Sequence, residues 1–188
     1  MSGPRVTLVE PVDAPLLARP YYATEGETSP IVRALAQVPE LVPATMPFVA
    51  QVLGPAALGL RAKELIVLRV SERAGCDYCV GAHRVAAADA GVSAHEDAAL
   101  TGRVPLENAF AGDELALLRL CDAVAAGGEV DDAVVDPVRR TFGDHGLVEI
   151  VLAAAATLML NRLCTTLRLP LTSSTAARLR ALDAGVPA

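Results

Sequence analysis

The sequence predicts an all-α protein. No segment shows the strict alternation of apolar and polar residues that is typical of a strand, whereas several segments have apolar residues at helical spacing and end at a glycine. Apolar residues make up 53% of the chain but aromatic residues only 3%, so the core must consist mainly of alanine, leucine and valine, which favours closely packed helices. With 188 residues, the chain is long enough to bury such a core as one domain.

The beginning of the chain differs in composition from the rest, because prolines and turn-forming residues are frequent there: Pro4, Pro11, Pro15, Pro20, Gly26 and Ser29. We expect residues 1–29 to form an N-terminal arm with little regular structure, and residues 30–188 to form a single helical domain. This domain should begin with two short helices over residues 31–53, broken near Pro39 and Pro43.

The central part of the chain predicts a helical hairpin. Residues 61–74 have a helical period that stops at Gly75, and residues 76–90 follow as a second helix. Gly91 closes this second helix, at a position where a left-handed backbone conformation is common. Because the two helices are separated by a very short turn, we expect them to pack side by side.

Helices are expected to fill the rest of the chain, over residues 93–101, 113–126, 131–142, 144–167 and 173–184. Ser93 is a favoured N-cap residue, Pro137 should interrupt the segment that contains it, and Pro170 should end the longest helix.

Charge and hydropathy favour a cytoplasmic protein that binds neither nucleic acid nor membranes. The formal net charge is −6 and no basic run could neutralise phosphates. Residues 1–20 lack the apolar core of a secretory signal, and the longest apolar run, residues 150–160, is too short to span a bilayer. Because cytoplasmic cysteines stay reduced, a Cys-x-x-Cys pair in this chain is expected to be catalytic or metal-binding rather than a structural disulfide.

The residues best suited to chemistry are Cys76, Cys79 and His83. On a helical wheel they fall within an arc of roughly 60°, on the side of the helix that carries small apolar residues. If the helix begins near Cys76, both sulfurs lie in its first turn, where unpaired N–H groups and the helix dipole favour a thiolate. His83, one turn after Cys79, can take the thiol proton, so the two groups should titrate as a pair.

Glu64 in the preceding helix is a candidate partner for His83. It points roughly 140° away from Arg69, the centre of the solvated stripe, and therefore inward. If the chain folds back at Gly75, Val67 lies opposite His83 and Glu64 is displaced by about 4.5 Å along the axis. Its side chain or one water can bridge that distance, which would give a carboxylate that orients a base beside a nucleophile.

This pattern resembles a known family. Glu64, a Cys-x-x-Cys pair twelve residues on, and His83 four residues after the second cysteine are similar to the signature of the alkylhydroperoxidase D and carboxymuconolactone decarboxylase superfamily. The likeness extends from about Pro30 to Pro170 and includes Met159 to Leu163. It implies an alkylhydroperoxidase D-like helical bundle, with the Cys-x-x-Cys pair on a central helical hairpin, in a homo-oligomer that is a trimer or a hexamer.

The resemblance also implies roles in a thiol-dependent peroxidase. Cys79 would be the thiolate that meets the hydroperoxide, Cys76 the resolving partner, His83 the base and Glu64 the start of a proton relay. An external dithiol would reduce the resulting disulfide, and we expect no cofactor and no metal. The chain departs from the family pattern at Tyr78, where characterised peroxidases carry histidine; its phenol either donates a hydrogen bond near the sulfurs or packs.

Three other interpretations stay open. The chain could be a redox sensor or a general disulfide oxidoreductase, or it could be a decarboxylase-like enzyme that acts on a small organic acid through His83 and Glu64. The decarboxylases of the superfamily generally lack the cysteine pair, which argues against the latter. Zinc bound by the same cysteine, histidine and glutamate side chains is the third alternative. Cys121 and Cys164 stand alone in apolar helices and are expected to be packing residues.

Overall fold

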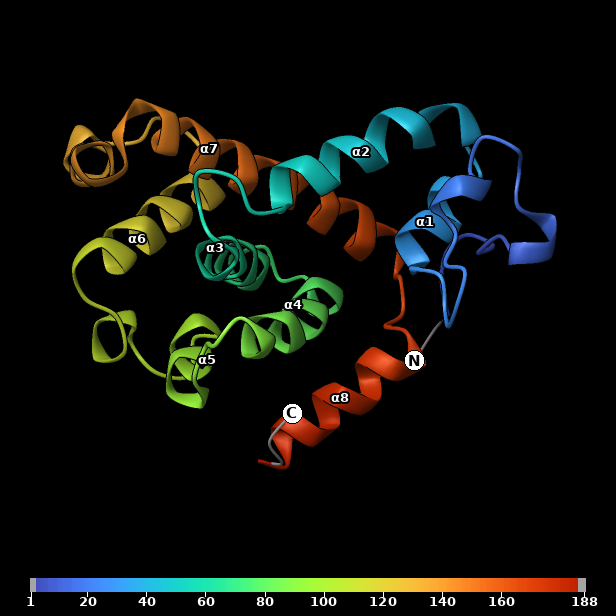
Figure 1. Ribbon diagram of the computed structural model, residues 1–188. Coiled ribbons are helices and arrows are strands. Elements are labelled where there is room, and N and C mark those ends of the chain that lie inside the picture. Colours follow the sequence, from blue (N-terminus) through green and yellow to red (C-terminus); the bar gives the residue numbers. More distant parts are fainter. Residues whose placement is uncertain (1–2, 186–188) are drawn as a thin grey trace.

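The computed structural model describes residues 3–185. These residues form helices and turns and contain no strand, which confirms the predicted all-α fold (Figure 1). The α-helices of the described residues are, in chain order, α1 (Pro30–Leu35), α2 (Val42–Leu53), α3 (Leu60–Arg73), α4 (Asp77–Asp89), α5 (Ala94–Leu100), α6 (Gly112–Ala126), α7 (Asp132–Leu167) and α8 (Ser173–Asp183).

The helices α3 and α4 form a hairpin in which only residues 74–76 separate them. Gly75 has a φ of 66°, a left-handed conformation that costs glycine little and other residues more. Its N–H donates to the carbonyl of Glu72 at 3.1 Å, and the N–H of Cys76 donates to the carbonyl of Ser71 at 3.0 Å. This is a Schellman motif, which satisfies the last carbonyls of α3. Cys76 is also the N-cap of α4, because its Sγ accepts the N–H of Cys79.

The helix α3 runs through the centre of the molecule, with α2 and α7 on one side and α4, α5 and α6 around the rest (Figure 1). Leu65, Ile66 and Leu68 are fully buried. Lys63 is also buried, and its Nζ donates to the carbonyl of Val52 at 2.6 Å and lies 2.7 Å from Glu149 Oε1 of α7. Since a buried ammonium is tolerated only when it is paired, this contact fixes α3 against α2 and α7.

The break expected near Pro39 and Pro43 is confirmed, because residues 36–41 separate α1 from α2. Pro43 itself lies at the second position of α2, where the missing N–H has no intrahelical acceptor in any case. The interruption expected at Pro137 is wrong. Pro137 lies inside the first half of α7 and the helix continues past it. The discontinuity in α7 occurs instead at Gly143, whose φ of 67° and ψ of 179° are not helical, so the two segments expected over 131–142 and 144–167 do meet at a kink.

The end of α7 at Leu167 agrees with the expected helix over residues 144–167. The helix stops there because Arg168 adopts a left-handed conformation, with a φ of 53°, before Pro170 is reached. By length and composition alone α7 could cross a membrane, with a mean hydropathy of 1.7 in its most apolar window. In the structure 44% of that window is buried, as α7 packs against α3 and α6.

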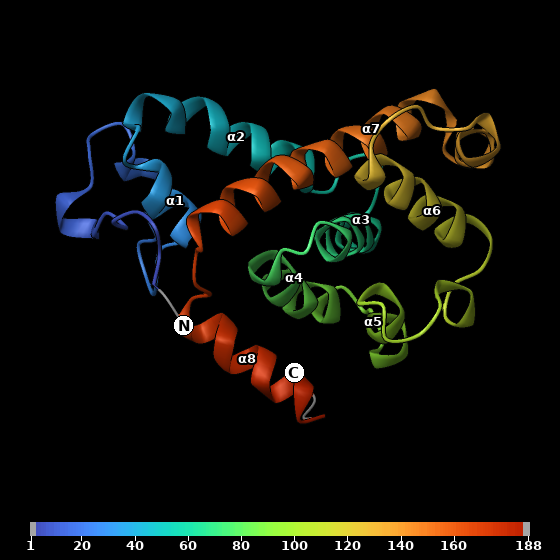
Figure 2. The same ribbon diagram turned by 180° about the vertical axis from the view of Figure 1, so that it is seen from behind.

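The segments before α1 and after α7 lie against this helical core. Residues 3–29 follow an irregular path with single 3₁₀ turns at Pro11–Asp13 and Arg19–Tyr21 (Figure 2). The N–H of Arg5 donates to the carbonyl of Leu167 at 2.9 Å, which holds this segment to the end of α7. After α7, α8 packs on α4 at Gly81, where an added Cβ would lie 3.1 Å from Leu179 of α8.

The α3–α4 turn gives a test of the fold. Replacing Gly75 with alanine should lower the free energy of unfolding by about 1–2 kcal/mol, because an L-residue is strained at a positive φ even where space is open. Urea denaturation of both proteins measures this difference. The matched control is Gly3→Ala, which changes a glycine without a positive φ and with nothing within 4 Å, and should leave the midpoint within error. Equal stability of the Gly75→Ala protein would contradict the assigned turn.

Candidate active site

Three cysteine sulfurs lie together at the N-terminal end of α4. Cys76 and Cys79 come from its first turn and are only 1% and 4% exposed, and Cys164, near the end of α7, is 1% exposed in the same cluster. The Sγ atoms of Cys76 and Cys79 are each within hydrogen-bonding reach of the Cys164 thiol. The end of α7 therefore completes a centre of three thiols rather than two.

The expectation that Cys164 is an isolated packing residue is wrong. It lies far from the Cys-x-x-Cys pair in sequence, and the contact arises because α7 crosses the start of α4 in the folded chain. In the sequence, a role for Cys164 could have been inferred only from its position one turn after Asn161, at the end of the segment that resembles the superfamily. Cys121 does belong to the main apolar core, as expected, and burial raises the pKa of its thiol.

The pKa values of Cys76 and Cys79 are shifted in opposite directions. Hydrogen bonds from the thiols of Cys164 and Cys79 to the Cys76 sulfur hold the pKa of Cys76 well below its usual range. The N–H of Cys79 adds a further bond to the same sulfur, at 3.4 Å. A bond to Cys164 favours the Cys79 anion, but donation to Cys76 and burial outweigh it and raise the pKa of Cys79. The negative charge therefore rests on Cys76, at the N-cap of α4.

Glu64 and His83 form the second part of the site. His83 Nδ1 lies 2.8 Å from Glu64 Oε2, a direct hydrogen bond across the α3–α4 hairpin. Glu64 is 7% exposed, and the side chain of His83 is 26% exposed. Because a carboxylate accepts, Nδ1 donates, and Nε2 is left as the nitrogen that can exchange a proton. Among residues 3–185 His83 makes no hydrogen bond to a sulfur, so its expected pairing with Cys79 is not direct.

Tyr78 closes the cluster on the outer side. Its hydroxyl lies 3.5 Å from Ser29 Oγ, next to the start of α1, and burial raises its pKa to about 12. Its ring packs against the sulfurs, so of the two expected roles the structure favours packing. With Tyr78, the apolar side chains of Val6, Leu8, Ile31 and Leu167 cover the three cysteines.

Asn161 is a residue whose place in the site the sequence did not indicate. It is 1% exposed on α7, its Nδ2 donates to Ser71 Oγ at 2.9 Å, and its amide reaches the Cys79 sulfur. Its Oδ1 is the buried side-chain atom within residues 3–185 that has no hydrogen-bond partner. A buried acceptor without a protein partner is costly, so Oδ1 keeps the capacity to accept one more hydrogen bond beside the sulfurs.

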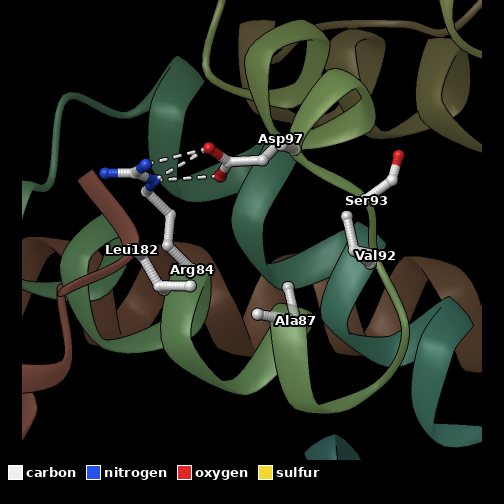
Figure 3. Close-up of a pocket in the computed structure, with 8 residues that line it drawn as sticks. Arg84, Ala87, Val92, Ser93, Asp97 and Leu182 are labelled. Atoms are coloured by element: carbon white, nitrogen blue, oxygen red, sulfur yellow. Dashed lines mark hydrogen bonds and ion pairs between the residues drawn. The ribbon is translucent and has the colours of Figure 1, made fainter. Parts of the chain in front are cut away.

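Two hollows of the surface lie away from the sulfurs. One of about 90 Å³ lies between α4, α5 and α8, where Arg84 pairs with Asp97 (Figure 3). The same Arg84 also binds Asp183 at 2.8 Å, so its charge is already matched by protein carboxylates. A second hollow is lined by Arg69 and Leu106 and by none of the three cysteines.

Over the part of the chain that the structure describes, no group of three or more histidine, cysteine or acidic side chains is arranged so as to hold a metal ion, and this includes the three cysteines of the cluster.

Comparison with known proteins agrees with the fold. Residues 39–108 match the carboxymuconolactone decarboxylase family, and no curated protein matches the chain. The alkylhydroperoxidase AhpD core of an uncharacterised peroxidase-related protein from Ralstonia eutropha is similar, with a TM-score of 0.82 and 20% identity over 94% of this chain and 96% of that one.

Two further solved structures are similar. A protein of unknown function from Agrobacterium tumefaciens, described as a candidate antioxidant defence protein AhpD, has a TM-score of 0.66 and 27% identity over 73% of this chain and 94% of its own. The debrominase Bmp8 in its apo form has a TM-score of 0.76 and 20% identity over 94% of this chain and 96% of that one. These likenesses confirm the alkylhydroperoxidase D-like fold.

The assignment of the negative charge can be tested by titration. Removing the Cys164 thiol donor with Cys164→Ala should raise the pKa of Cys76, so that the ultraviolet absorbance of the thiolate disappears at a higher pH as the solution is acidified. Absorbance measured from alkaline to acidic pH on both reduced proteins gives the two curves. Cys121→Ala, which removes a buried cysteine outside the cluster, is the control and should follow the wild-type curve. Superimposable curves for Cys164→Ala and the wild type would refute the assignment.

Proposed function

Because residues 39–108 match the carboxymuconolactone decarboxylase family and the fold is alkylhydroperoxidase D-like, we propose that the chain is a thiol-dependent peroxidase, which passes electrons from an external dithiol to a hydroperoxide through Cys76 and Cys79. The observation that carries this proposal is a thiolate held beside a second thiol at the start of α4, on the same hairpin as the Glu64–His83 pair. A buried thiolate with an adjacent thiol is what peroxide reduction to a disulfide requires.

Attack on the peroxide begins with a proton shift. When the proton of Cys79 moves along its hydrogen bond to Cys76, the negative charge is transferred to Cys79 without an outside base. The Cys79 sulfur then attacks an oxygen of the hydroperoxide, the O–O bond breaks, and the alkoxide leaves. Cys79 is now a sulfenic acid, and the alkoxide takes the proton that Cys76 had received, which forms an alcohol and restores the Cys76 thiolate.

The second step forms the disulfide. Cys76, as the thiolate, attacks the Cys79 sulfur, the S–O bond breaks, and hydroxide leaves and is protonated to water. The pair Glu64 and His83 supports this proton traffic, since the carboxylate stabilises an imidazolium that gives its proton from Nε2 to a leaving oxygen. The unpartnered Oδ1 of Asn161 can accept the hydrogen of the sulfenic acid.

The proposed chemistry requires a reductant and is compatible with the cytoplasm. The disulfide must be opened by an external dithiol, which is available in the reducing cytoplasm. The debrominase Bmp8 shares the fold and gives a second class of electron acceptor, a brominated organic compound, to which the same two thiols would pass two electrons. Decarboxylation through His83 and Glu64 is the other alternative, since residues 39–108 match a family named for that reaction.

Turnover with an organic hydroperoxide and dithiothreitol tests the proposal. The reduced wild-type protein should consume hydroperoxide continuously, and Cys79→Ser should reduce the rate to background. Cys76→Ser should turn over more slowly than wild type, because its sulfenic acid must be reduced without the resolving thiol. His83→Ala should lower the rate by about 100-fold, the scale of general acid catalysis. Cys121→Ala should be indistinguishable from wild type, because its sulfur lies in the main core.

The alternatives predict different results in the same experiment. A redox sensor would oxidise once in the wild-type protein and not turn over. A decarboxylase would retain its activity on an organic acid when Cys76 and Cys79 are both serine. A debrominase would turn over with a bromoaromatic compound and dithiothreitol, while hydroperoxide would be consumed no faster than by the Cys79→Ser protein.

We also propose a homo-oligomer, a trimer or a hexamer. It is supported by an exposed apolar stripe on one face of α7, formed by Val148, Val151, Leu152 and Met159, which are 64%, 39%, 45% and 46% exposed. Residues at this spacing share one side of a helix, and a contiguous apolar stripe in water favours association.

Light scattering on size-exclusion fractions tests the oligomer. The wild-type protein should have the mass of three or six chains, and a variant with aspartate at Val151 and Leu152 should have a smaller mass, because two carboxylates cannot be buried unpaired in an apolar interface. Aspartate at Val38, an exposed apolar residue outside the stripe, should leave the mass unchanged. A monomeric wild-type protein would rule out the oligomer.

A further inference from the structure

We propose that Cys164 is a third redox thiol of this centre, which exchanges with the Cys76–Cys79 disulfide to form a Cys76–Cys164 disulfide and returns Cys79 to the thiol state. The place of this step in turnover rests on the proposed peroxidase function. The exchange itself needs only an oxidised Cys76–Cys79 pair, whatever oxidant produced it.

The position of Cys164 supports this role. Its sulfur is within hydrogen-bonding reach of both Cys76 and Cys79, and all three side chains lie in one buried cluster. The hydroxyl of Thr165, the next residue of α7, also reaches the Cys76 sulfur, so the last turns of α7 lie directly against the N-cap of α4. A buried cysteine that only fills space has apolar neighbours, as Cys121 does in the main core.

The Cys164–Cys76 contact is the one that points to exchange with Cys76. The thiols of Cys164 and Cys79 both lie beside the Cys76 sulfur in one buried cluster, so an attacking thiol and a leaving thiol flank the same sulfur. Thiol–disulfide exchange requires a thiol next to a disulfide sulfur, and water is excluded from this cluster, where the sulfurs are 1–4% exposed. The third thiol is therefore already in place when the first disulfide forms.

The exchange step is balanced within the protein. The Cys164 thiolate attacks Cys76 Sγ, the Cys164–Cys76 bond forms, and the Cys76–Cys79 bond breaks. Cys79 leaves as a thiolate and takes up the proton that Cys164 gave up, along the hydrogen bond between these two sulfurs. The oxidation state of the three sulfurs together does not change, so no further oxidant or reductant is consumed.

The second disulfide differs from the first in what it connects. Cys76 and Cys79 are in one turn of one helix, whereas Cys76 and Cys164 join the start of α4 to the end of α7. Only the second bond closes a long loop, so only it should restrict the unfolded chain and raise the melting temperature. It also fixes the turn whose carbonyl, at Leu167, binds the N-terminal segment through the N–H of Arg5.

Disulfide mapping tests the proposal. The reduced wild-type protein is oxidised with one equivalent of diamide, its remaining thiols are alkylated under denaturing conditions, and tryptic peptides are analysed by mass spectrometry. Cleavage at arginine places Cys76 and Cys79 together in peptide 74–84 and Cys164 alone in peptide 163–168. The first disulfide leaves these peptides separate, whereas the exchanged disulfide links them.

The expected result is the linked pair of peptides in the wild-type protein and in Cys121→Ala, and its absence in Cys164→Ala. Cys79→Ala should give the linked pair as its main oxidised product, since Cys76 and Cys164 are then the only thiols of the cluster. The melting temperature should rise by several degrees on oxidation of the wild type and not of Cys164→Ala.

The proposal is overturned if wild type shows only the internal disulfide of peptide 74–84 with Cys164 fully alkylated, or if Cys79→Ala remains unlinked. The use of diamide keeps this result separate from the peroxidase proposal. Linked peptides without hydroperoxide turnover would reject the peroxidase and keep the exchange, and turnover without linked peptides would do the reverse.

Discussion

The geometry of the thiol centre depends on the turn between α3 and α4. Cys76 takes part in both helices, because its N–H closes the end of α3 on Ser71 and its Sγ caps α4 by accepting the N–H of Cys79. The left-handed Gly75 makes this double role possible, since it reverses the chain without a linker. The same turn sets the register of the hairpin, and this register brings His83 to within 2.8 Å of Glu64.

Much of this arrangement could be predicted from local sequence. The glycines that end the helices and the helical spacing of Cys76, Cys79 and His83 depend on residues close in the chain, so periodicity and capping rules apply to them directly. The Glu64–His83 contact could be predicted for the same reason, because a connection of three residues leaves little freedom in how the two helices align. The two residues were expected to be displaced by about 4.5 Å along the helix axis. The glutamate side chain spans this displacement, so the hydrogen bond to His83 is direct and needs no bridging water.

The contribution of α7 could not be predicted in the same way. Cys164 and Asn161 reach the sulfurs only because α7 bends at Gly143 and crosses α4, and a crossing of this kind depends on the packing of the whole core. The predicted interruption at Pro137 failed for a related reason. Contacts with the rest of the protein hold together a helix that proline alone would break. A cysteine in an apolar helix is predicted to be a core residue, and a chemical role can be inferred only when its neighbours in space are known.

Burial gives the centre both its reactivity and its main constraint. Exclusion of water strengthens the hydrogen bonds by which two thiols stabilise the Cys76 anion, so the closed cluster favours a thiolate that an open one would not. The same closure, by Tyr78 and the apolar residues of the N-terminal segment, leaves the three cysteines only 1–4% exposed. A molecule that reaches these sulfurs must therefore displace part of this cover. The cover is attached at Leu167, one turn from Cys164, so the residues that surround the sulfurs also control access to them.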